Sequence, residues 1–166
     1  MDTAGWTLDY EPAAIADVEE ILDHLGDRPD ATFVDLGCGK GRVLILAARR
    51  RFRRVVGVEI VPSLASTARW NVQRPDALRR SHDIAVVEGD AGALPLPLGP
   101  LVLFLYNPFE ASIVASVARR AGAVGATIVL AYPREEKALL DAGFREVARR
   151  GASDLFDDWR VYSTMP

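Results

Sequence analysis

Apolar positions along the chain follow two patterns, one typical of buried strands and one typical of amphipathic helices. Short apolar runs predict strands at residues 31–36, 54–60, 82–88, 101–106, 126–132, 144–149 and 155–165. Apolar residues spaced three or four apart predict helices over 12–25, 42–51, 62–72 and 110–121, with a short helix between 133 and 143. Strands and helices therefore alternate along most of the chain.

This alternation predicts the fold class. Strands joined through helices form right-handed crossovers, which build a parallel sheet covered on both faces. The last two strands have only about five residues between them, too few for a crossover helix, so they should pair antiparallel. We expect an α/β protein, a three-layer αβα sandwich whose seven-stranded, mostly parallel sheet has an antiparallel last strand.

Length and composition fit one domain. The 166 residues can bury a single core, and 49% apolar with 26% charged residues is ordinary for a globular protein. We expect residues 1–30 to form an N-terminal helical segment and residues 31–166 to form a Rossmann-like core. The net charge of −3 provides no overall attraction to nucleic acid or to an anionic membrane.

The remaining composition restricts compartment and chemistry. Cys38 is the single cysteine, so no intramolecular disulfide can form, which fits a reducing compartment. Neither a signal peptide nor an 18-residue apolar run is visible, so we expect a cytoplasmic protein without a membrane partner. His24 and His82 are isolated, and no metal site is predicted.

A glycine-rich turn separates the first core strand from its helix. Gly37, Gly39 and Gly41 allow unusual φ values and close approach of a ligand to the backbone, while the helix N-terminus favours an anionic group. The third glycine of a dinucleotide fingerprint would fall on Arg42, which is too large for that role. A phosphate-binding loop needs Ser or Thr after Lys40, where Gly41 stands.

The segment from Asp35 to Gly41 reads Asp-x-Gly-x-Gly-x-Gly and resembles the first motif of the class I S-adenosylmethionine-dependent methyltransferases. The resemblance spans roughly residues 31–132 and implies that S-adenosylmethionine is the cofactor. It implies that the turn formed by Gly37, Cys38, Gly39 and Gly41 cradles the methionine end. Asp35 should support this turn and approach the cofactor's ammonium group.

Two further acids follow strand ends, where open α/β sheets bind ligands. Glu59 ends the second strand, and its carboxylate can accept hydrogen bonds from both ribose hydroxyls, with Ile60 beside it. The resemblance implies that Asp90 reads the adenine amino group and that the backbone N–H of Ala91 reaches a ring nitrogen.

The fourth strand ends in Tyr106-Asn107-Pro108-Phe109, where acceptor and methyl group must meet. This segment resembles the Asp/Asn-Pro-Pro-aromatic motif of amino-group methyltransferases. The resemblance makes Asn107, Pro108 and Phe109 the catalytic candidates, with Asn107 also near the cofactor. One proline is absent, which favours a protein or small-molecule amine over a nucleobase. Beside Tyr106, Phe109 and Tyr132, desolvation would favour the neutral form of an amine.

Three other features lie outside these motifs. Tyr10 could fold over the cofactor as a lid, by resemblance only. We expect Trp70 to be a core or helix-packing residue rather than an adenine platform. The arginine-rich stretch 49–54 reads as a solvated surface turn rather than a phosphate grip.

The sequence thus predicts methyl transfer from S-adenosylmethionine to a nitrogen atom of an unknown acceptor. A homodimer could complete the acceptor pocket. Two alternatives stay open: a non-catalytic subunit that binds S-adenosylmethionine, and an NAD-dependent enzyme of the Rossmann type.

Overall fold

The computed structural model describes residues 12–106, 109–150 and 158–164. The strands are β1 Arg28–Leu36, β2 Phe52–Glu59, β3 Ile84–Glu88, β4 Leu101–Tyr106, β5 Thr127–Ala131, β6 Arg145–Arg149 and β7 Trp159–Ser163. The helices are α1 Ile15–Leu25, α2 Arg42–Ala47, α3 Pro62–Gln73, α4 Ala111–Ala123 and α5 Glu136–Asp141. In these ranges no helix is both long and apolar enough to cross a membrane.

The strands form one seven-stranded sheet in the order β3-β2-β1-β4-β5-β7-β6. The pairings among β1 to β5 are parallel, whereas β7 runs antiparallel to both of its neighbours, β5 and β6. This confirms the predicted fold class and the antiparallel last strand. Strand order reverses between β1 and β4, and open sheets bind ligands beside such a switch point.

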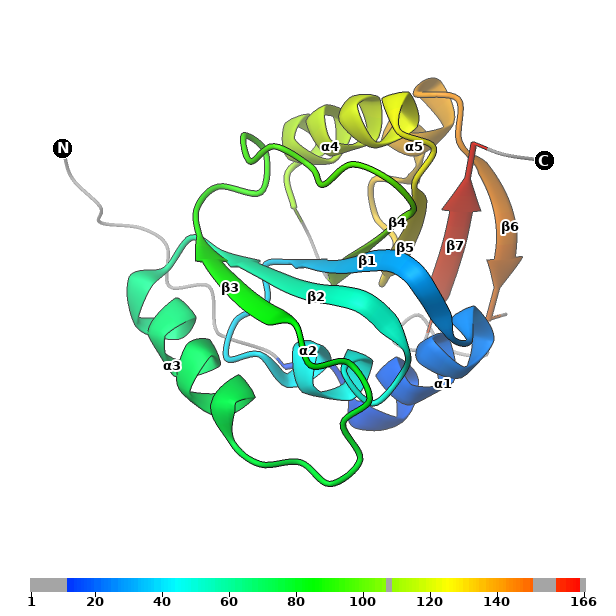
Figure 1. Ribbon diagram of the computed structural model, residues 1–166. Coiled ribbons are helices and arrows are strands. Elements are labelled where there is room, and N and C mark those ends of the chain that lie inside the picture. Colours follow the sequence, from blue (N-terminus) through cyan, green and yellow to red (C-terminus); the bar gives the residue numbers. More distant parts are fainter. Residues whose placement is uncertain (1–11, 107–108, 151–157, 165–166) are drawn as a thin grey trace, which may run out of the picture.

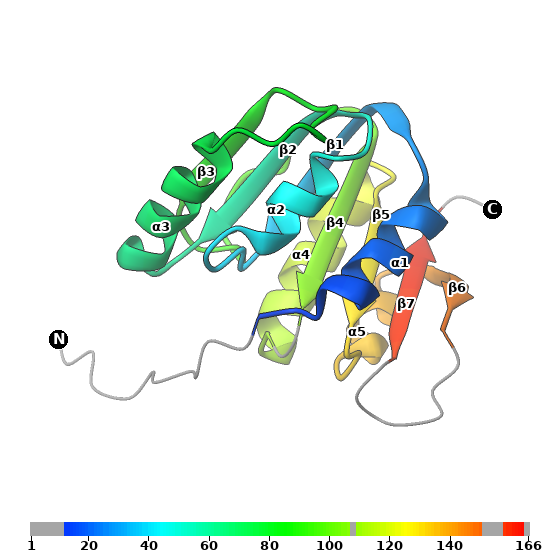
Figure 2. The same ribbon diagram turned by 90° about the horizontal axis from the view of Figure 1, so that it is seen from below.

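Helices cover both faces of the sheet (Figures 1 and 2). Helices α1, α2 and α3 lie on one face, and α4 and α5 lie on the other. Each face has its own core, as alternate residues of a strand show: Phe33 of β1 packs with the α1–α3 layer, while Val34 and Leu36 pack with the α4–α5 layer. This arrangement makes the three-layer sandwich that the alternation of elements predicted.

Strand β4 shows why a central strand reads as a continuous apolar run. Its residues Leu101 to Leu105 are all at most 3% exposed, because both faces are covered. Val102 and Phe104 pack toward α1–α3, and Leu103 and Leu105 pack toward α4–α5. The run ends at Tyr106, at the edge of the sheet where the predicted site lies.

The predicted second helix was too long. Helix α2 ends at Ala47, because the backbone N–H groups of Arg49 and Arg50 bond back only three residues and tighten the chain into a turn. Strand β2 correspondingly begins two residues early, at Phe52. Its ring packs against Phe33 of β1 with ring centroids 5.1 Å apart. A contact between distant residues therefore sets this boundary.

Candidate active site

The glycine turn is anchored to the end of β2. The backbone N–H groups of Gly37 and Cys38 both donate to the carbonyl of Val58, at 2.8 and 2.9 Å. Gly41 then adopts φ +84° immediately before α2. Helix α3 also contacts the turn, since the Asn71 amide donates to the carbonyl of Lys40 at 2.9 Å. The turn thus lies at the carboxyl end of the sheet, at the predicted position.

Gly37 occupies a position that other residues would fit poorly. Its φ is +79°, a left-handed conformation that disfavours residues with a Cβ. A Cβ placed there would lie 3.0 Å from Cζ of Phe109. The half-buried Phe109 ring therefore lies against the glycine turn, which the sequence motif did not indicate.

Glu59 connects the end of β2 to this turn. One carboxylate oxygen, Oε2, accepts the backbone N–H of Gly39 at 2.8 Å, and the other, Oε1, accepts that of Val61 at 2.8 Å. The residue is only 6% exposed. A carboxylate oxygen has two acceptor sites, so these bonds leave acceptor capacity for ribose hydroxyls. Sequence reasoning found Glu59 but missed its role in holding the turn.

Asp35 is buried in β1, directly before the turn. Burial, with a smaller contribution from the charge of Glu59, raises the pKa of Asp35 to about 8. The carboxyl group of Asp35 is therefore mainly protonated at neutral pH. Two acids close together cannot both ionise cheaply in a buried setting.

Cys38 and Gly57 fit together beneath the turn. A Cβ at Gly57 would lie 2.6 Å from Sγ of Cys38 and 2.5 Å from Cδ1 of Leu44. Burial also raises the pKa of the Cys38 thiol, so it stays neutral and is no nucleophile. The sequence analysis did not single out Gly57, although a glycine inside an apolar strand often marks such a close approach.

The predicted adenine-binding residues lie at the ends of β2 and β3. Glu59 is in register with Glu88, so Asp90 follows next to the end of β2. Asp90 is exposed, and its Oδ1 accepts the N–H of Gly92 at 2.7 Å in a tight turn. Ala91 is buried beneath this turn, whereas Ile60 is 65% exposed at the rim. These groups, with the glycine turn, suit an adenosyl compound that has an amino-acid tail.

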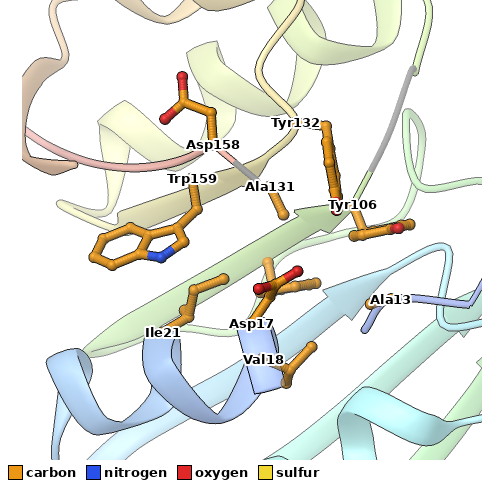
Figure 3. Close-up of a pocket in the computed structure, with 10 residues that line it drawn as sticks. Ala13, Asp17, Val18, Ile21, Tyr106, Ala131, Tyr132, Asp158 and Trp159 are labelled. Atoms are coloured by element: carbon orange, nitrogen blue, oxygen red, sulfur yellow. The ribbon is translucent and has the colours of Figure 1, made fainter. Parts of the chain in front are cut away.

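A small aromatic cavity lies beside this rim, between α1 and the ends of β4 and β5 (Figure 3). Tyr106 and Tyr132 meet edge to face there, with ring centroids 5.2 Å apart. The cavity has a volume of about 10 Å³, and Asp17 of α1 turns its carboxylate toward it. Asn107 and Pro108, the catalytic candidates, lie outside the described residues, as does Tyr10.

Two polar groups of this cavity have unusual surroundings. Asp17 accepts a hydrogen bond from Nη1 of Arg150 at 2.8 Å, which partly offsets its charge. Trp159 is 5% exposed, and its Nε1–H has no hydrogen-bond partner among the described residues. Tyr132 has φ +60°, a strained value for a tyrosine. Strained residues and unsatisfied buried donors concentrate at functional sites.

Trp70 and the arginine-rich turn both lie outside this site. The assignment of Trp70 to the core or to helix packing was wrong, because its side chain is 61% exposed and contacts the guanidinium of Arg74. Arg49 and Arg50 of the arginine-rich turn form ion pairs with Asp76 and Asp23. The described part of the chain has no cluster of His, Cys, Asp or Glu that could hold a metal ion.

Comparisons with known proteins agree with this geometry. A family profile described as a methyltransferase domain matches residues 33–121. The ribosomal protein L11 methyltransferase of Burkholderia ambifaria is 30% identical over 125 residues, which cover 73% of this chain and 39% of the relative. The chain thus spans about two fifths of the length of that curated relative.

Solved structures share the fold. An RNA methyltransferase from Salinibacter ruber, in complex with S-adenosyl-L-homocysteine, superimposes with a TM-score of 0.72 and 21% identity, covering 93% of this chain and 94% of that one. A geranyl diphosphate C-methyltransferase from Streptomyces coelicolor gives a TM-score of 0.69 with 16% identity, covering 90% and 76%.

The strand order also decides between the cofactor classes that the sequence left open. Dinucleotide-binding Rossmann sheets have the order 3-2-1-4-5-6, without the antiparallel strand that β7 inserts beside β5. The strand order therefore excludes the NAD-dependent Rossmann enzyme. S-adenosylmethionine as the cofactor agrees with both the sequence of the glycine turn and the family match. The chain belongs to the methyltransferase domain family and has the fold of the class I S-adenosylmethionine-dependent methyltransferases.

Proposed function

We propose that this protein transfers a methyl group from S-adenosylmethionine to the nitrogen of an amine carried by a protein or a small molecule. The bound cofactor supplies a methyl group that is already activated by its sulfonium, so the protein contributes binding and alignment. The observation that supports an amine acceptor is the Asp17 carboxylate in an aromatic cavity at the ends of β4 and β5.

The residues at the rim would hold the cofactor as follows. The turn from Gly37 to Gly41 presents open backbone to the methionine end. The Glu59 carboxylate would accept hydrogen bonds from the ribose hydroxyls, because the bonds from Gly39 and Val61 occupy only one acceptor position on each oxygen. Ile60, Asp90 and Ala91 border the adenine.

The aromatic cavity suits an amino group by size and charge. A volume of about 10 Å³ is about the least that admits one water molecule, and an amino head group is of similar size. Asp17 would accept an amine N–H, and the faces of Tyr106 and Tyr132 tolerate a cation. Carboxylate and aromatic rings would therefore capture the amine before transfer.

The amine must lose its proton to solvent before it can attack the methyl group, whose bond to the sulfonium then breaks and leaves S-adenosylhomocysteine. A lysine-like amine has a pKa of about 10.4 in water. The buried side chains of Val18, Ile21 and Trp159 remove water from the cavity, and desolvation lowers the pKa of an amine. The Asp17 carboxylate would by itself raise the pKa of the amine, and the positive charge of Arg150, hydrogen-bonded to Asp17, reduces that effect.

The motif residues Asn107, Pro108 and Phe109 complete the proposal. The Asn107 side chain and the proline-fixed backbone would accept hydrogen bonds from the target amine, as the resemblance implies. Phe109 lies against Gly37, so its ring would contact both the cofactor turn and the transferring methyl group.

The first test is calorimetric titration with S-adenosylmethionine, S-adenosylhomocysteine and NAD. We expect the two sulfur compounds to bind and NAD not to bind. Transfer is then measured with cofactor tritiated in its methyl group and a panel of acceptors: lysine peptides, polyamines, phenols and carboxylates. Amines should be labelled, and the labelled nitrogen is identified by mass spectrometry.

The variant Asp17→Asn isolates the role of the carboxylate. It should raise the KM for the amine about tenfold or more while leaving cofactor affinity unchanged. The matched control is Asp23→Asn on the same helix, since Asp23 lies on the surface beside Arg50. Labelling of oxygen or carbon acceptors alone, or an unchanged KM in Asp17→Asn, would reject the amine assignment. Cofactor binding without any transfer would instead favour the non-catalytic subunit.

A further inference from the structure

A basic groove lies on the α1–α3 face of the sheet, outside the aromatic cavity. It has a volume of about 670 Å³ and runs along α2 between α1 and α3. Figure 2 shows these three helices side by side, and α2 contacts both others. The charged groups that line the groove are Lys40, Arg42, Arg49, Arg74, Arg79 and Asp76. It begins at Lys40 in the glycine turn and extends toward the opposite edge of the sheet.

The groove collects positive charge on a chain whose net charge is −3. It has five cationic side chains and one carboxylate, and that carboxylate, Asp76, already pairs with Arg49 at 2.9 Å. Glu19 also lies 4.0 Å from Arg49. The guanidinium of Arg42 donates to the carbonyl of Ala13 at 2.9 Å, which fixes its position without neutralising it. The surface therefore attracts an anion with several charges.

An exposed aromatic ring borders the groove. Trp70 is 61% exposed, and the guanidinium of Arg74, a groove residue, lies 4.8 Å from the centroid of its ring. Most of the surface of this large indole is therefore open to solvent beside a cationic groove. Proteins that bind single-stranded nucleic acid combine these two features: cations follow the phosphates, and aromatic rings stack on the bases.

We propose that this groove binds a single-stranded polynucleotide, with its phosphates along Arg42, Arg74 and Arg79 and one base on Trp70. An acidic peptide would use the charges but not the ring. A flat membrane surface would not enter a groove between three helices. The inference goes beyond the proposed function and holds whichever atom accepts the methyl group.

The experiment uses the full chain and a fluorescein-labelled single-stranded RNA of roughly 12 nucleotides, followed by fluorescence anisotropy. Binding should fall in the range of about 10⁻⁴ to 10⁻⁶ M at physiological salt. The logarithm of the binding constant should decrease linearly with the logarithm of salt concentration. Arg74→Gln should reduce the magnitude of this slope by about 0.7, the value for one phosphate contact on a single strand.

Trp70 provides a second, independent variant. Trp70→Ala should weaken binding at least about fivefold with an unchanged salt slope, and Trp70→Phe should retain most of the affinity. The matched control is Arg119→Gln, because Arg119 is an exposed arginine of α4 on the opposite face. This control should bind like the unaltered chain. Far-ultraviolet circular dichroism and calorimetry with S-adenosylmethionine verify that each variant is folded.

Several results would overturn the proposal. One is absence of RNA binding at low salt by a chain that binds S-adenosylmethionine. Another is an equal loss of affinity in Arg74→Gln and Arg119→Gln, since general charge would then explain binding. Competition by polyglutamate of matched charge as strong as that by unlabelled RNA would replace the polynucleotide with an acidic protein. Tighter binding to phosphatidylserine vesicles than to RNA would replace it with a membrane.

Discussion

Glu59 accepts the backbone N–H of Gly39 at 2.8 Å and so joins the end of β2 to the glycine turn that follows β1. Its second oxygen accepts the N–H of Val61 and also orders the start of α3. One buried carboxylate thus shapes the surface on which a cofactor would lie. Its loss should affect both stability and cofactor affinity, and the two effects can be measured separately.

Glu59→Ala should lower the affinity for S-adenosylmethionine at least tenfold, which corresponds to about 1.4 kcal/mol. It should also lower the free energy of unfolding by about 1.5–3 kcal/mol, because two backbone donors lose a charged partner. Calorimetry measures the first and urea denaturation the second. Glu88→Gln, in register with Glu59 on β3, is the control and should change neither strongly. Unchanged affinity in a folded Glu59→Ala would remove the ribose assignment.

Gly37→Ala should destabilise the protein by about 1–2 kcal/mol, since its φ of +79° disfavours alanine. The new Cβ would also press on Phe109, 3.0 Å away. The double variant with Phe109→Ala should remove the steric part and leave the backbone part. Urea midpoints compare these chains with Gly89→Ala, whose added Cβ would lie 3.7 Å from Leu94. A neutral Gly37→Ala would contradict the geometry of the turn.

Asp35 should make stability depend on pH. Its pKa is raised to about 8 in the folded protein, above the value of about 3.9 expected when unfolded. The folded state therefore binds more protons between these values. The contribution of Asp35 is fully present below about pH 4 and is lost as pH rises toward 8, with a slope of up to about 1.4 kcal/mol per pH unit.

Urea denaturation between about pH 5 and pH 8 measures this dependence. Asp35→Asn should have a flatter profile than the unaltered chain, because the amide does not titrate. The opposite result would be a free energy of unfolding that increases with pH in the unaltered chain but not in Asp35→Asn. That result would show that Asp35 is ionised in the folded protein.

Ser81 satisfies the backbone where β2 begins. Its hydroxyl oxygen accepts the N–H of Phe52 at 2.8 Å, and its single O–H lies within reach of two acceptors, the carbonyls of Phe52 and Arg50. Ser81→Ala should cost about 0.5–1.5 kcal/mol of unfolding free energy, because the Phe52 N–H loses its shorter hydrogen bond and keeps only the 3.2 Å bond to the carbonyl of Arg50. Thermal or urea unfolding measures this cost against Ser66→Ala, an exposed serine of α3. Equal stability of the two variants would refute this role.

The predictable part of the site follows from local chemistry. The glycine turn, Glu59 and Asp90 could be located because strand ends and turn residues are marked within a few positions of the chain. The role of Glu59 in holding Gly39 could not be predicted, since it joins residues 20 positions apart. The contact of Phe109 with Gly37, and the placement of Asp17 beside Tyr106, likewise depend on segments that only folding brings together.

The sequence alone determined the layers, the apolar centre at β4 and the reversed β7, because hydrophobic period and loop length are properties of short segments. Tertiary structure decided where α2 ends and why position 57 must be a glycine. It also brought arginines from distant parts of the chain together between α1, α2 and α3, and it left Trp70 exposed. Packing density and the summed electric field arise from groups far apart in the chain, so periodicity does not report them.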